Sequence, residues 1–231
     1  MVALIFGCMI GARCVRSKRE FHTSGSIMDR RIFFVGLGSF LLIGIVAVWT
    51  IFFGGSGNYR GTTYGEPYPV APEFTLTRGD GTSFQLSQMR GNIVMLFFGY
   101  TSCPDICPTT LAGLKQALGK LDEGDAKQVK VLFVTVDPKR DTPERMQEYV
   151  NNFNTDFIGL SGTETDLQKI WNDYGIYREI SDQSTALGYI VNHTARVTVI
   201  DRNGKMRISF GTDMQVDDIV HDLKLMLKEK E

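Results

Sequence analysis

The chain has 231 residues, a formal net charge of −1 and a hydrophobic content of 43%. That length allows one or two domains, and the composition is ordinary for a chain that folds around an apolar core. The near-neutral total charge gives no electrostatic reason to bind the phosphates of a nucleic acid, so we expect no nucleic-acid partner.

An uncharged apolar stretch, residues 32–53, lies near the amino terminus. It is long enough to cross the roughly 30 Å core of a bilayer as one transmembrane helix, and too long for the apolar region of a cleaved signal peptide. Arg30 and Arg31 precede it, so the positive-inside rule keeps residues 1–31 in the cytoplasm or the mitochondrial matrix. Met28 would make a sensible start, which makes the segment before it a candidate start-site artefact.

We therefore expect a single-pass protein of the inner (cytoplasmic) membrane, with its main domain on the periplasmic side. The alternative is the mitochondrial inner membrane, with the domain on the intermembrane-space side. Residues 54–71 are rich in Gly, Pro, Tyr and Thr, which is typical of a linker, and residues 72–231 would form the domain.

The domain alternates between apolar runs typical of strands and amphipathic stretches typical of helices. The expected strands are, in chain order, 74–76, 83–86, 93–99, 129–136, 157–160, 195–200 and 206–210. The expected helices are 108–121, one that begins at 143, 167–174 and 216–227. This order predicts an α/β fold with a mixed central sheet, helices on both faces and an amino-terminal β-hairpin around Asp80-Gly81.

Two cysteines, Cys103 and Cys107, stand in the segment CPDICP directly after the buried strand 93–99, where open α/β sheets place their sites. The start of a helix lowers the pKa of a thiol, and the thiolate is the reactive and metal-binding form. Residues four apart are neighbours on a helix, so the pair could chelate a metal or form a disulfide. A purely structural disulfide and plain burial of two small side chains also stay open.

His193 is the favoured third ligand among the three histidines. It is expected in a loop, 188–194, that leads into the strand starting at Ala195. His22 would lie on the other side of the membrane, and His221 falls in the carboxyl-terminal helix. Thiolate and imidazole together suit copper or zinc, whereas hard cations prefer oxygen.

Asp137 begins the segment DPKRDTP, just beyond the second core strand and so near the same edge of the sheet. Its carboxylate could orient the metal site or meet a partner. The other interpretation is a turn followed by a helix, with Thr142 as N-cap and Pro143 at the first helical position. Lys139 and Arg140 are expected in solvent.

Together, FFGYTSCPDICPTTL, VDPKRDTPERMQEYV and the late NHT resemble the SCO/SenC family of copper chaperones for cytochrome c oxidase, over roughly residues 72–231. The resemblance implies a thioredoxin-like fold, one membrane anchor, and a copper ion, Cu(I) and also Cu(II), held by Cys103, Cys107 and His193. It implies a role in preparing the dinuclear copper centre of cytochrome c oxidase subunit II, with other copper chaperones as further partners. Members commonly carry aspartate before this histidine, where the chain has Asn192, so copper affinity or redox tuning is expected to differ.

The leading hypothesis is thus a metallochaperone, which is not an enzyme in the usual sense. The alternative is a thiol–disulfide oxidoreductase that uses Cys103 and Cys107 as a redox disulfide and acts on the cysteines of subunit II or another extracytoplasmic partner. That activity would leave His193 dispensable. Two features disfavour an oxidoreductase: three residues, and not two, separate the cysteines, and no proline follows Pro143. A peroxidase with one catalytic cysteine is the third hypothesis.

Overall fold

The computed structural model describes residues 43–45, 59–185 and 188–229. The expected membrane span, 32–53, lies outside the described residues except for 43–45. No helix within the described ranges is long and apolar enough to cross a bilayer. The chain divides into two units, and the second, Gly57–Glu231, holds every element discussed below.

An eight-stranded mixed sheet forms the centre of this unit, with the strands in the order β1-β10-β9-β4-β5-β6-β2-β3. The strands are β1 (Thr62–Thr63), β2 (Thr75–Arg78), β3 (Ser83–Gln85), β4 (Ile93–Gly99), β5 (Val129–Thr135), β6 (Ile158–Ser161), β9 (Val197–Ile200) and β10 (Met206–Phe210). β4, β5 and β6 run parallel, while β9 and β2 pair antiparallel with β4 and β6 respectively. The prediction of a mixed central sheet is confirmed.

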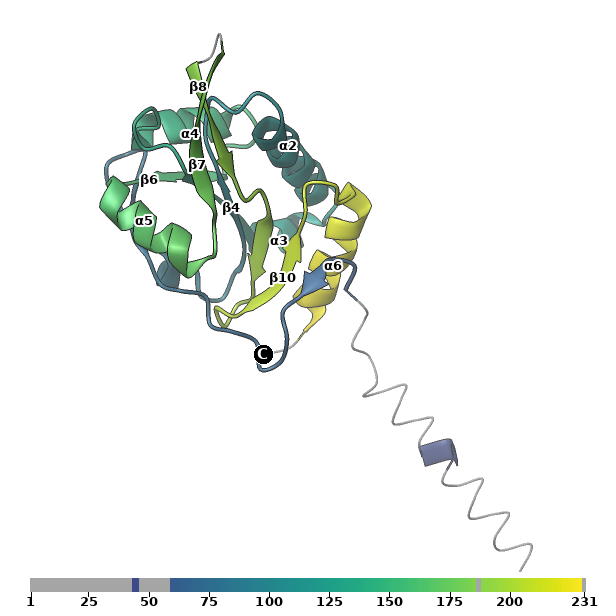
Figure 1. Ribbon diagram of the computed structural model, residues 1–231. Helices are drawn as coiled ribbons and strands as arrows, with labels where there is room; N and C mark the ends of the chain where they lie inside the picture. Colours follow the sequence, from purple (N-terminus) through teal and green to yellow (C-terminus); the bar gives the residue numbers. More distant parts are fainter. Residues whose placement is uncertain (1–42, 46–58, 186–187, 230–231) are drawn as a thin grey trace, which may run out of the picture. The chain divides into compact units, whose positions relative to one another are not determined.

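Helices cover both faces of the sheet. They are the 3-10 helix η1 (Leu86–Met89), α2 (Ile106–Gly119), the short α3 (Glu123–Lys127), α4 (Pro143–Asn151), α5 (Glu164–Asp173) and α6 (Val216–Lys228). Figure 1 shows α2 and α6 on one side of β4 and the helices α4 and α5 on the other. Every residue of β4 is therefore buried, which explains why its sequence, IVMLFFG, is apolar without alternation.

The hairpin turn and the helix cap that the sequence predicts are both present in the structure. β2 and β3 form a hairpin whose turn carries Gly81 at a φ of +80°, a conformation open to glycine at little cost. Thr142 caps α4, since its side chain accepts a hydrogen bond from the N–H of Arg145 at 3.2 Å, and Pro143 occupies the first helical position.

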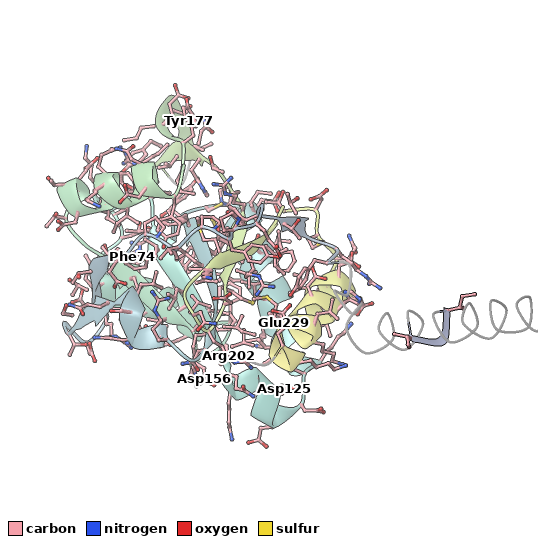
Figure 2. All side chains as sticks on the ribbon, turned by 90° about the horizontal axis from the view of Figure 1, so that it is seen from below. Phe74, Asp125, Asp156, Tyr177, Arg202 and Glu229 are labelled. Carbon is pink, nitrogen blue, oxygen red and sulfur yellow. The ribbon has the colours of Figure 1, made fainter. Side chains whose placement is uncertain are left out.

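One prediction about the site region is wrong: residues 188–193 form a strand and not a loop. β7 (Arg178–Thr185) and β8 (Gly188–His193) pair antiparallel as a separate two-stranded sheet, which projects from the body in Figure 1. The β7 sequence, REISDQST, is mostly polar, in contrast to the wholly apolar strand β4. Figure 2 shows Tyr177, just before β7, at the periphery of the unit, where it is 61% exposed.

Part of the segment expected as a linker is held against the carboxyl-terminal half of the domain. Its strand β1 pairs with β10, and Val70 forms an isolated bridge with Lys205. The fully buried carboxylate of Asp222, in α6, accepts hydrogen bonds from the backbone N–H groups of Arg60 and Gly61 at 2.8–3.0 Å. From about Arg60 onward, the chain is therefore integrated into the fold.

Candidate metal centre

The two cysteines lie where β4 passes into α2. Cys103 is half-buried in the turn after the strand, and Cys107 is fully buried in the first turn of the helix. The helix begins at Ile106, so Pro108 sits at an early position whose N–H would otherwise have no partner. The N–H of Cys107 donates to Sγ of Cys103 at 3.4 Å, and no disulfide joins the two residues.

This geometry gives the two sulfurs opposite acid–base behaviour. The pKa of Cys103 is lowered to about 6, chiefly by a hydrogen bond from the Cys107 thiol and further by the backbone N–H groups of Asp105, Cys107 and Ile106, while burial opposes the shift. The same hydrogen bond and burial raise the pKa of Cys107 far above its ordinary value. At neutral pH the pair is therefore an outer thiolate that accepts a hydrogen bond from an inner thiol.

His193 ends β8 with its ring ordered by two neighbours. Its Nδ1 lies 3.0 Å from the carbonyl oxygen of Thr194, and the ring stands edge-on to Tyr100, with 5.9 Å between the centroids. Because a carbonyl can only accept, Nδ1 carries the proton and Nε2 keeps its lone pair. Burial lowers the pKa of His193, so the imidazole is neutral at pH 7, as a metal ligand must be.

Cys103 and His193 line the same open pocket, which has a volume of about 240 Å³. Ile106, which is 38% exposed, and Asn192 also line it, whereas Cys107 lies behind Cys103 and does not reach its surface. Within the described part of the chain, no three His, Cys, Asp or Glu side chains lie together as a ready-made metal site. The structure thus pairs Cys103 with each of the other two candidates, but it does not draw all three around one point.

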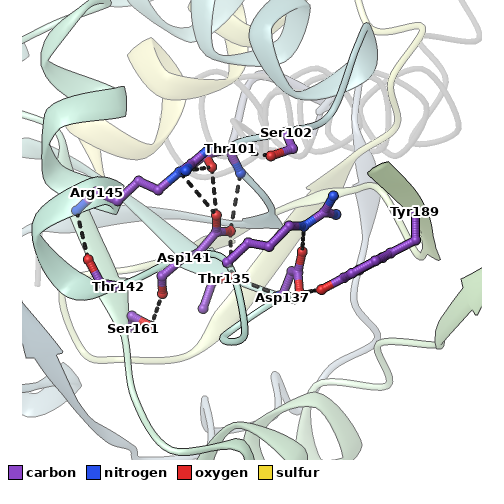
Figure 3. Close-up of polar contacts among 10 residues, drawn as sticks. Thr101, Ser102, Thr135, Asp137, Asp141, Thr142, Arg145, Ser161 and Tyr189 are labelled. Atoms are coloured by element: carbon purple, nitrogen blue, oxygen red, sulfur yellow. Dashed lines mark hydrogen bonds and ion pairs between the residues drawn. The ribbon is translucent and has the colours of Figure 1, made fainter. Parts of the chain in front are cut away.

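Asp137 is fully buried just beyond the carboxyl end of β5, in contact with Tyr189, which precedes the pocket-lining Ile190 on β8. Its carboxylate accepts hydrogen bonds from the hydroxyl of Tyr189 at 2.6 Å and from Nε of Arg140, as Figure 3 shows for the tyrosine. The expectation that Arg140 lies in solvent is wrong, because its guanidinium lies 3.8 Å from the centroid of the Tyr189 ring and its side chain is 19% exposed. The arginine neutralises a carboxylate that could not otherwise be buried.

Sequence reasoning missed three residues beside the candidate ligands: Tyr100, Tyr189 and Asp141. The two tyrosines had no distinguishing signal, since Tyr100 directly follows a predicted strand and Tyr189 lies within a predicted loop. Asp141 accepts hydrogen bonds from Thr101, two residues before Cys103, and its spacing of four from Asp137 was the one available signal. The other described histidine, His221, lies outside this pocket and has its Nδ1 2.9 Å from Oδ1 of Asp222.

Comparison with known proteins places the chain in a family. The family model described as SCO1/SenC matches residues 62–228. The chain belongs to the SCO1/SenC family. It is 32% identical over 162 residues to the SCO2-like protein RP587 of Rickettsia prowazekii, which covers 70% of this chain and 78% of that protein.

Solved structures of SCO1/SenC proteins share the fold. Copper-bound ScoI of Bradyrhizobium japonicum matches with a TM-score of 0.62 and 32% identity, over 68% of this chain and 99% of that one. Apo Sco1 of Thermus thermophilus matches with a TM-score of 0.66 and 36% identity, over 74% of this chain and 98% of that one. The family resemblance drawn from the sequence motifs is confirmed, and so is the thioredoxin-like α/β fold that it implies.

Proposed function

We propose that this SCO1/SenC protein is a membrane-anchored copper chaperone that binds copper through Cys103, Cys107 and His193. One observation carries the proposal: Cys103 and His193 open onto the same pocket, with the N–H of Cys107 directly against the Cys103 sulfur. Copper-bound structures of similar proteins, from Bradyrhizobium japonicum and from yeast at 28% identity, support copper as the cargo.

The donor set fits copper in its chemistry. A thiolate at Cys103 and the free Nε2 of His193 are soft and borderline donors, which favour copper over hard cations. Cys107 would contribute a second sulfur, because a coordinating metal deprotonates a thiol outright. The hydrogen bond between Nδ1 of His193 and the Thr194 carbonyl would hold the imidazole in the tautomer that leaves Nε2 available.

The open pocket suits a protein that gives its copper away. A ligand of an incoming partner could approach Cys103 and His193 from the solvent side, past Ile106, and exchange with them one at a time. As the family resemblance implies, the receiving protein would be cytochrome c oxidase subunit II, at its dinuclear copper centre, with other copper chaperones as further partners. Residues 32–53 would anchor the chain in the inner membrane, with residues 72–231 on the periplasmic or intermembrane-space side.

Titration of the reduced, full-length chain with Cu(I) against a chromogenic chelator tests the proposal. The wild type should bind one Cu(I) ion, and Cys103→Ser or His193→Ala should weaken binding at least about tenfold. His221→Ala is the matched control, because this histidine pairs with Asp222 in α6 and does not line the pocket. Equal affinity of His193→Ala and the wild type would refute the three-ligand site.

A thiol–disulfide oxidoreductase is the second candidate, and the opposite pKa shifts of the two cysteines favour it. The Cys103 thiolate would attack a partner's disulfide and release one partner thiolate. Cys107 would then lose its proton and attack the mixed disulfide, which releases the second partner thiol and leaves a Cys103–Cys107 disulfide. Reduction of a model disulfide that survives in His193→Ala but is lost in Cys107→Ser would support this activity.

Asp137 and Asn192 are proposed to act through the ligands. Asp137 holds Tyr189, which lies on β8 four residues before His193, so its carboxylate would help to set the position of the histidine. Asn192 lines the pocket next to the histidine with an uncharged amide. A carboxylate there would add a negative charge beside the metal and strengthen its binding.

A further inference from the structure

The loop that carries Cys103 is tied to one buried carboxylate. Asp141 is fully buried, and its carboxylate accepts hydrogen bonds from the N–H of Thr101 at 3.1 Å and from the Thr101 hydroxyl at 2.6 Å. Arg145 donates to the same hydroxyl at 2.8 Å (Figure 3). Thr101 lies two residues before Cys103, so Asp141 holds the backbone at the point where the loop leaves β4.

The Thr135 hydroxyl connects this carboxylate to Asp137. It lies 2.8 Å from Asp141 Oδ2 and 2.8 Å from the backbone nitrogen of Asp137. An N–H can only donate, so the hydroxyl accepts from Asp137 and uses its single proton to donate to Asp141. Thr135 is fully buried, which leaves no water to replace either bond.

On the other side, the carboxylate of Asp137 reaches the strand of the histidine. It accepts from the hydroxyl of Tyr189 at 2.6 Å (Figure 3). Side chains of a strand alternate between its faces, so Tyr189, Val191 and His193 share one face of β8. Val191 is 2% exposed, which means that this shared face is the one turned toward the body of the domain.

These contacts close into a circuit that links the loop of Cys103 to the strand of His193, because the ring of His193 packs edge-on against Tyr100, the residue before Thr101. We propose that Asp137, Thr135 and Asp141 form a brace that positions the loop of Cys103 relative to the strand of His193. The effect of the brace on copper affinity rests on the proposed function, whereas its effect on the exposure of Cys103 in the metal-free protein does not.

The two carboxylates of the brace act as positioning groups and not as metal ligands. Asp141 accepts from Thr101 and Thr135, and Asp137 accepts from Tyr189 and Arg140. Their oxygen atoms are thus occupied by donors within the fold, and both residues are fully buried. A buried carboxylate is tolerated when its hydrogen bonds are satisfied, and removing one donor is costly because the acceptor then has no partner.

Two variants of Thr135 test the brace, with one control. Thr135→Val keeps the shape of the side chain and removes its hydroxyl, whereas Thr135→Ser keeps the hydroxyl. Ser161→Ala is the control, since the buried Ser161 hydroxyl donates at 2.6 Å to the backbone carbonyl of Asp141 and not to its carboxylate. Asp141→Asn is an independent variant, which changes the end of the brace that holds Thr101.

Two properties of the full-length chain are measured: the rate of Cys103 alkylation in the reduced, metal-free protein at pH 8, and Cu(I) affinity. Thr135→Val and Asp141→Asn should raise the alkylation rate about threefold or more, because a looser loop exposes the sulfur. They should also weaken Cu(I) binding about tenfold or more, because the loss of groups that orient metal ligands typically lowers metal affinity by that amount. Thr135→Ser should stay within about threefold of the wild type in both measurements.

The control separates positioning from general loss of stability. Ser161→Ala should lose stability, measured by urea unfolding, while both site measurements stay within about threefold of the wild type. The brace is refuted if Thr135→Val resembles Ser161→Ala in both measurements, or if Thr135→Ser is as impaired as Thr135→Val. If Asp141→Asn does not fold, the Thr135 pair alone decides, and if the wild type binds no Cu(I), the alkylation rates still test the brace.

Discussion

The acidity of Cys103 depends on its inner partner, and replacing that partner should change the acidity measurably. Cys107→Ala removes the hydrogen-bond donor that is the largest cause of the lowered pKa of Cys103, which is about 6. A hydrogen bond to a charged group contributes about 1.5–3 kcal/mol, and one pKa unit corresponds to about 1.4 kcal/mol. Cys103 is half-exposed, and solvent screening therefore favours the lower end of this range, so we expect its pKa to rise by about one unit.

The assay is alkylation of the reduced, metal-free chain by iodoacetamide between pH 4 and pH 10, with the modified peptide that contains Cys103 quantified by mass spectrometry. Only the thiolate reacts, so the rate rises with pH and is half-maximal at the pKa. The wild type should be half-maximal near pH 6 and Cys107→Ala near pH 7, while Cys107→Ser, which keeps a hydroxyl donor, should lie between them. A half-maximal pH near 9 in the wild type would show that the pKa of Cys103 is not lowered, and no difference between wild type and Cys107→Ala would show that Cys107 does not lower it.

Three further substitutions test other parts of the account. Asp222→Ala leaves the N–H groups of Arg60 and Gly61 without their acceptor, and should lower the free energy of unfolding in urea by about 1–3 kcal/mol with Cu(I) affinity nearly unchanged. Gly99→Ala should cost about 1–3 kcal/mol and also slow copper loading, because the new Cβ would lie 2.7 Å from the sulfur of Cys107. Asn192→Asp should tighten Cu(II) binding severalfold in a competition titration, and weaker binding would contradict the role given to that position.

Much of the scaffold could be predicted because burial on both faces leaves a strong sequence signal. β4 has the predicted bounds, and its parallel neighbour β5 ends one residue before the predicted end. Parallel strands end at the same edge of a sheet, and the register of Gly99 opposite Thr135 places the cysteine loop and Asp137 side by side, as expected.

The missed features share a physical cause: they depend on contacts between segments far apart in the chain. β7 is largely polar and β8 has only the short apolar run Tyr189–Val191, so no apolar period marks the ribbon. Arg140 is a charged residue in a polar segment, which is typical of a solvated side chain, and only the fold brings Tyr189 over its guanidinium. The importance of Asp141 likewise follows from Thr101, forty residues earlier in the chain, which no local pattern connects to it.

The proposed site holds one copper ion between two sulfurs and one imidazole nitrogen. X-ray absorption at the copper edge of the Cu(I)-loaded, full-length chain tests it most directly, in the wild type and in His193→Ala. We expect two sulfur neighbours and one nitrogen neighbour in the wild type, and loss of the nitrogen in the variant. A copper environment that contains only sulfur in the wild type, or that is identical in both proteins, would contradict it.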